Sequence, residues 1–176
     1  MQARQLVGLD VTGGTANKLV AFDSATPSVI TAELHVSGLQ AGERLLGIDY
    51  GATGDDVLSD TAGNDTMRGD SGSDDLAGGE DGDEVDAGSG NDTARGGAGP
   101  DTVIVRDDHG GDDRLFGSDG DDQILGGPGR DQLNGGNQND TLNSQDFPNE
   151  PDKNDCGPGT DTVLADGLDT SINCSP

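Results

Sequence analysis

Aspartate is the residue whose type and spacing point most clearly to chemistry in this sequence. Aspartates recur every nine residues from Asp56 to Asp101, and the series restarts at Asp113 and runs to Asp140. A carboxylate is a hard oxygen ligand of the kind that divalent cations such as Ca²⁺ take. We therefore treat the periodic aspartates as candidate metal ligands: Asp56, Asp65, Asp74, Asp83, Asp92, Asp101, Asp113, Asp122, Asp131, Asp140 and Asp161.

The residues around these aspartates follow the same period. Glycine stands two positions before most of them, and an apolar residue stands two positions after each of the first ten. The pattern is G-G-x-G-x-D-x-U-x, with U apolar, which is typical of parallel β-solenoids that bind Ca²⁺. Residues 96–104 and 126–134 match it at every fixed position. The apolar set is Leu58, Met67, Leu76, Val85, Ala94, Val103, Leu115, Ile124, Leu133 and Leu142.

Some repeats depart from the pattern, and we expect their turns to bind a cation more weakly. Asp81 and Gln138 replace the glycine at the fourth position, where Asp81 could alternatively act as an additional acidic ligand. The residues that replace glycine at the first two positions include Asp60, Thr61, Ala87 and His109.

The elements that would position the aspartates are short. Six residues of each repeat predict a turn, because glycines allow positive φ, and the last three predict a strand. Two repeats would complete one coil, so that each repeat stacks on the next but one at about 4.8 Å. The sequence thus predicts an all-β parallel roll with two sheets of short strands and the aspartates in two columns.

Stacked carboxylates repel each other, and a divalent cation held between successive coils reverses the sign of that interaction. The apolar content is only 29%, too little for a conventional core. We therefore expect metal-free repeats to be disordered and metal binding to be coupled to folding. The alternatives on composition are a solvated acidic tail and a disordered buffer that binds Ca²⁺ without folding.

On these motifs, residues of about 51–164 resemble the RTX, or haemolysin-type, calcium-binding repeat family. The resemblance implies a right-handed β-roll, several bound Ca²⁺ ions and ligation by the repeat aspartates together with turn carbonyls. It also implies a secreted, extracellular protein. The main hypothesis is a structural calcium-binding module, and the alternative is a non-catalytic C-terminal part of a larger secreted enzyme, toxin or adhesin.

The net charge of the protein limits the classes of partner that it can bind. The formal net charge is -26, which disfavours binding to nucleic acid and to anionic membranes. No segment is long and apolar enough to cross a membrane, and the N-terminus lacks a signal-peptide pattern. We expect calcium ions as partners, no nucleic acid and no membrane insertion, with export through a signal outside this sequence or by another route. Nothing in the sequence identifies a protein partner.

Residues 1–50 differ from the repeats and predict a small antiparallel sheet. Apolar runs at residues 6–11, 18–23, 30–36 and 44–50 are separated by turn-rich segments at 12–17, 24–28 and 37–43. Residues 17–19, 22–27, 36–39 and 45–50 resemble one blade of an uncharacterised family of secreted bacterial propeller-like proteins. We divide the chain into three parts. Residues 1–50 form a four-stranded antiparallel segment that could cap the repeats, and residues 51–143 form the roll. Residues 144–176 contain a degraded repeat, a final repeat and a disulfide-locked C-terminal cap.

The C-terminal part contains two irregularities and two cysteines. The steps from Asp101 to Asp113 and from Asp140 to Asp152 are each twelve residues. We expect the first insertion to extend a strand over residues 103–106, and the second to begin a degraded repeat over 147–155 with Asn154 in the apolar slot. Cys156 and Cys174 are eighteen residues apart, one coil, which favours a disulfide over free buried thiols. The ending around both cysteines also resembles actinobacterial repeat proteins.

Catalytic motifs are missing from the sequence. It contains neither H-E-x-x-H nor G-x-S-x-G, and His35 and His109 lie far apart. The G-D-S-G at residues 69–72 follows the period of nine, which explains it better than a protease site does. We expect no enzymatic activity.

Overall fold

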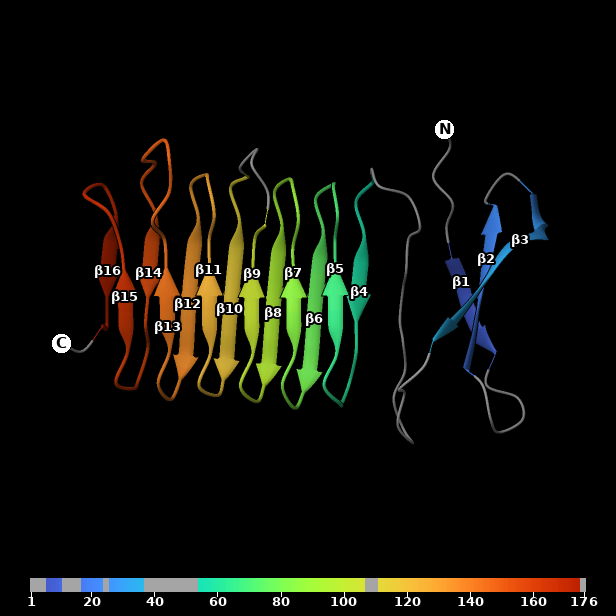
Figure 1. The fold of residues 1–176 in the computed structure, drawn as a ribbon, viewed down its shortest axis with the longest axis horizontal. Coiled ribbons are helices and arrows are strands. Elements are labelled where there is room, and N and C mark those ends of the chain that lie inside the picture. Colours follow the sequence, from blue (N-terminus) through green and yellow to red (C-terminus); the bar gives the residue numbers. More distant parts are fainter. Residues whose placement is uncertain (1–5, 11–16, 24–25, 37–53, 107–110, 175–176) are drawn as a thin grey trace.

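The computed structural model describes residues 6–10, 17–23, 26–36, 54–106 and 111–174. Every regular element in these residues is a β-strand, and none of them forms a helix that could span a membrane. From Val57 to Ile172 the chain winds as a parallel solenoid of short strands (Figure 1). The expected β-roll with two parallel sheets is confirmed.

The chain alternates between the two sheets, so strands adjacent in a sheet are next but one in sequence. All neighbours within both sheets are parallel. The seven-stranded sheet contains β4 (Val57–Ser59), β6 (Asp75–Glu80), β8 (Thr93–Ala98), β10 (Arg114–Asp119), β12 (Gln132–Asn137), β14 (Lys153–Asp155) and β16 (Thr170–Ile172). The six-stranded sheet contains β5 (Thr66–Arg68), β7 (Glu84–Asp86), β9 (Thr102–Ile104), β11 (Gln123–Leu125), β13 (Thr141–Asn143) and β15 (Thr162–Leu164).

The core is a stack of the predicted apolar residues between the two sheets. Nine of the ten are buried, and Leu58 is partly buried against them. In β5 the burial runs exposed, buried, exposed, which is the alternation of a strand with one face inward. Burial of a leucine or valine side chain contributes about 1.5–3 kcal/mol. Because each strand is only three to six residues long, this stacking rather than any single strand holds the solenoid together.

The two insertions lengthen turns and leave the register intact. Leu58 lies opposite Leu76, eighteen residues on, whereas Ala94 lies opposite Leu115 and Leu133 opposite Asn154, each twenty-one residues on. The second insertion lies in the long loop that joins β13 to β14 (Figure 1). The degraded repeat therefore supplies a strand in register, with Asn154 in the apolar slot.

The prediction that the strand at the first insertion extends over residues 103–106 is wrong, because β9 ends at Ile104. Val105 is still buried, and its amide donates to the carbonyl of Leu125 at 3.1 Å, but Arg106 is exposed. Keeping Val103 opposite Ile124 preserves the core, so the additional residues are accommodated after the strand.

Glycine at the fourth position of the repeat is required by close approach of the coils. Gly90 has φ 133°, and a methyl group on it would collide with the carbonyl oxygen of Gly72 in the preceding coil. Asp81 and Gln138 occupy the same position with φ 75° and 80°, so they also take left-handed backbone conformations. The side chain of Asp81 is exposed, which separates it from the buried aspartates of the columns.

Three strands near the N-terminus pair antiparallel in the order β1 (Leu6–Asp10), β2 (Asn17–Asp23) and β3 (Thr26–Val36). β3 begins within the segment expected to be a turn, where Thr26, Val29 and Ile30 favour a strand. The fourth strand expected at residues 44–50, and the turn before it, lie outside the described residues.

Candidate functional site

The aspartates at the sixth position of the repeats form two columns, one along each edge where a turn enters a strand. All eleven aspartates predicted from the sequence belong to them, and the register adds Asp152 and Asp169. The first column contains Asp56, Asp74, Asp92, Asp113, Asp131, Asp152 and Asp169. The second column contains Asp65, Asp83, Asp101, Asp122, Asp140 and Asp161.

A ladder of hydrogen bonds fixes one oxygen of each carboxylate. The main-chain N–H of Asp56 donates to Oδ1 of Asp74 at 2.7 Å, and that of Asp65 donates to Oδ1 of Asp83 at 2.9 Å. The same bond, from one coil to the next, recurs along both columns. It orients each side chain toward the coil before its own.

The other carboxylate oxygen is buried without a hydrogen-bond partner in many of these residues. An unpaired charged oxygen removed from water is costly, so it calls for a cation or a proton. Oδ2 is in this state in Asp74, Asp83, Asp101, Asp122, Asp131, Asp140, Asp152 and Asp161.

These oxygens face the first position of the turn, where a main-chain carbonyl also arrives. A methyl group on Gly78 would collide with Oδ2 of Asp83 and would lie 2.6 Å from the carbonyl oxygen of Gly96. Gly135 stands in the same relation to Oδ2 of Asp140 and to the carbonyl oxygen of Cys156. A carboxylate oxygen and a carbonyl oxygen of the next coil thus converge on one space that glycine leaves open.

This donor set fits a hard cation such as Ca²⁺, which takes carboxylate and carbonyl oxygens. The described residues contain no group of three or more histidine, cysteine, aspartate or glutamate side chains placed to hold a metal. An ion here would therefore depend on main-chain carbonyls as much as on carboxylates. The glycines are part of the site because they let those carbonyls approach.

Burial raises the pKa of several column carboxyls, and in most of these neighbouring carboxylates raise it further. The pKa of Asp131 is raised to about 8, and those of Asp122 and Asp152 to about 7. The pKa values of Asp74 and Asp83 are raised to about 6 by the same causes. The hydrogen bond from the main-chain amide opposes this shift in each case without cancelling it. These carboxyls thus resist ionisation in the absence of a cation.

Asp152 and Asp169 are the column residues that the sequence did not identify as candidate ligands. Asp152 is buried, and its signals in the sequence are the twelve-residue step from Asp140 and the nine-residue step to Asp161. Asp169 accepts from the amide of Asp152 at 3.0 Å and from the hydroxyl of Ser144, also at 3.0 Å. Glu150 replaces the glycine expected two positions before Asp152, and Asp169 follows Asp161 by eight residues rather than nine.

The predicted disulfide is present between Cys156 and Cys174, whose Cα atoms are 4.9 Å apart. It joins the last two coils of the seven-stranded sheet. Beside it the core turns polar, because the side-chain amide of Asn154 donates to the hydroxyl of Ser144 at 2.8 Å.

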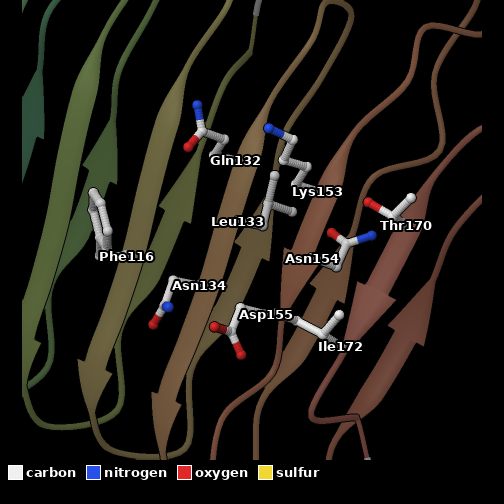
Figure 2. Close-up of a pocket in the computed structure, with 9 residues that line it drawn as sticks. All are labelled: Phe116, Gln132, Leu133, Asn134, Lys153, Asn154, Asp155, Thr170 and Ile172. Atoms are coloured by element: carbon white, nitrogen blue, oxygen red, sulfur yellow. The ribbon is translucent and has the colours of Figure 1, made fainter.

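A shallow groove of about 270 Å³ lies over the seven-stranded sheet (Figure 2). Its lining side chains come from the seventh, eighth and ninth repeat positions. It contains no column aspartate, so it is separate from the candidate cation sites. The lining residues are Phe116, Gln132, Leu133, Asn134, Lys153, Asn154, Asp155, Thr170 and Ile172.

Comparison with known families agrees with the geometry. The family model of the RTX calcium-binding nonapeptide repeat, in four copies, matches residues 50–85, 86–109 and 107–142. No curated protein and no solved structure matches the chain. The RTX repeat is a structural calcium-binding unit rather than a catalytic one. Since the matched ranges cover more than half of the sequence, the chain belongs to the RTX calcium-binding nonapeptide repeat family.

Proposed function

We propose that this protein is an extracellular structural module whose repeats fold when they bind several Ca²⁺ ions. The observation that carries the proposal is the buried, unpartnered Oδ2 of successive aspartates beside main-chain carbonyl oxygens. Without a cation, this arrangement places like charges in low-dielectric surroundings. With Ca²⁺ between coils, the same oxygens become ligands that join one coil to the next.

The proposed ligands are the eleven periodic aspartates together with Asp152. Asp169 differs because both of its carboxylate oxygens already accept hydrogen bonds from the protein. We assign it to the closure of the first column rather than to metal binding.

Two properties support an extracellular setting. The Cys156–Cys174 disulfide favours an oxidising compartment. Extracellular calcium modules bind at about 10⁻⁴–10⁻³ M, an affinity at which the cytosol would leave them empty. RTX repeat proteins are typically secreted, which agrees with both.

A solenoid needs ends that stop it from stacking further. We propose that residues 144–176 act as the C-terminal cap through the disulfide and the polar cluster of Asn154 and Ser144. We propose the antiparallel sheet of residues 1–50 as the corresponding N-terminal cap.

Circular dichroism of the full chain tests the proposal. The spectrum in excess chelator is expected to be that of a coil, and millimolar Ca²⁺ is expected to convert it cooperatively to β-structure, whereas the same concentration of Mg²⁺ converts it less. A spectrum that is already β-rich in chelator, or that ignores Ca²⁺, would contradict the proposal.

A further inference from the structure

Asp60 occupies a position at which the repeat has glycine. β4 pairs with β6 in register, and the amide of Asp60 donates to the carbonyl of Ala77 at 3.0 Å. Asp60 is therefore the first residue of its turn, in the same slot as Gly78 and Gly96 in the following coils. Substitution of a glycine in this slot by an acidic residue needs an explanation beyond a weaker turn.

The slot opens onto the candidate cation space. At Gly78, any side chain would meet Oδ2 of Asp83 and the carbonyl of Gly96. Ala87 and Cys156 are also first-position residues, and both are buried within the core cluster, so side chains at this position enter the coil. A carboxylate in this slot lies among the oxygens that face the space.

The carboxyl group of Asp60 is buried, and one of its oxygens is available to a ligand. Its side chain is only 7% exposed, and Oδ2 has no hydrogen-bond partner. Oδ1 accepts from the amide of Thr61 at 2.5 Å, which fixes the orientation of the carboxyl group. Asp60 and Asp65 both lie near the carboxyl group of Asp83 in the next coil.

We propose that Asp60 is an additional carboxylate ligand of the Ca²⁺ ion held between the turn of Asp65 and the turn of Asp83. This inference rests on the proposed function and deepens it. The affinity of a calcium site increases with the charge of its ligands, so this site is the tightest of the second column and fills first. The departure from the repeat pattern at Asp60 strengthens the site.

Two substitutions in the full chain test the assignment by calorimetric titration with Ca²⁺. Asp60→Asn keeps an oxygen for the amide of Thr61 but removes the charge, and Asp60→Gly restores the repeat pattern. Both are expected to weaken the tightest binding step by about tenfold, in line with ligand-charge tuning of calcium sites. Ala87→Gly is the matched control, because it restores the same pattern position without changing charge. It is expected to leave the tightest step unchanged.

Wild-type affinity in both Asp60 variants would overturn the inference and leave Asp60 as a turn cap only. If the wild-type chain binds no Ca²⁺ at all, the proposed function fails instead, so the two failures are distinguishable.

A second measurement uses the unaltered protein and does not depend on a variant folding. A trace of Gd³⁺ added to the calcium-loaded chain is expected to displace the ion with the most acidic ligands first. The amide signals of Thr61 and Gly79, whose residues face each other across this space, should then broaden before any others. Broadening of the amide signals to the same extent at every site of the second column would overturn the assignment.

Discussion

The main-chain amide of Asp92 donates a 2.7 Å hydrogen bond to Oδ1 of Asp113, although twenty-one residues separate them. The equivalent bond from Asp74 to Asp92 spans eighteen residues and is 2.8 Å long. The first column therefore continues through the insertion without a break. Stacking of coils, rather than spacing along the sequence, determines which aspartates are neighbours.

Removing one carboxylate from the middle of a column should weaken binding at that column. In Asp122→Asn the side-chain carbonyl oxygen can still accept the hydrogen bond from the main-chain N–H of Asp101, but the buried charge is lost. The Ca²⁺ concentration at the midpoint of folding, followed by circular dichroism, is expected to rise severalfold. Asp121→Asn is the control, because Asp121 is adjacent and exposed, and its midpoint should not move. Equal effects of the two variants would argue for a general charge effect.

Lowering the pH should stabilise the metal-free fold. In that fold, burial raises the pKa of Asp131 to about 8 and that of Asp122 to about 7, above the ordinary value of 3.8. These folded carboxyls hold protons that the unfolded chain has lost, so the metal-free fold gains stability as pH falls from about 8 toward 4. Circular dichroism in excess chelator is therefore expected to show a coil at about pH 8 and a partial gain of β-structure at about pH 5.

A chain in chelator that gives the same coil spectrum at both pH values would contradict this expectation. A loss of β-structure on acidification would contradict it as well.

Opening the disulfide should loosen the C-terminal coils. A loop of this length closed by a disulfide is worth about 3 kcal/mol in the chain-entropy model. The carbonyl of Cys156 also faces Oδ2 of Asp140, so the last site of the second column should weaken. In the Cys156→Ser, Cys174→Ser double variant, amide exchange at β14 and β16 is expected to accelerate in the presence of Ca²⁺. Exchange at β6 should stay as in the wild type, and uniform acceleration would mean that the disulfide supports the whole solenoid.

A methyl group at Gly117 should crowd the oxygens at the first position of its turn. It would collide with Oδ2 of Asp122 and lie 2.5 Å from the carbonyl of Gly135. Gly117→Ala is expected to lower the stability of the calcium-loaded chain by about 1–3 kcal/mol, measured by thermal unfolding. Gly167→Ala is the matched control, because nothing lies within 4 Å of a methyl group there. Equal stability of the two variants would show that the close approach at Gly117 does not matter.

The sequence was sufficient to predict the roll, its core and most of the columns. A nine-residue period places the eighth-position apolar residue and the sixth-position aspartate of each repeat at a fixed point of the coil. Leu115 could therefore be assigned to the core, and Asp113 to a column, from the sequence. Cys156 and Cys174 followed from the same geometry, since eighteen residues return the chain to the same place.

What the sequence did not predict depends on contacts between coils. Asp152 lies in a turn without the expected glycines, and the partner that satisfies Asn154 in the apolar slot, the hydroxyl of Ser144, comes from the insertion. The strand expected over residues 103–106 was wrong because core register outweighs the β-propensity of Val105. The role of Asp60 became visible only when the register placed it beside the carboxylates of neighbouring turns.

A crystal structure of the protein grown with Ca²⁺, with anomalous difference maps, tests the central claim most directly. The account predicts anomalous peaks between successive coils, at about 2.3–2.6 Å from Oδ2 of column aspartates such as Asp83 and Asp140 and from main-chain carbonyl oxygens. Side chains of Asp83 and Asp140 turned into solvent, with no peaks along the columns, would contradict it.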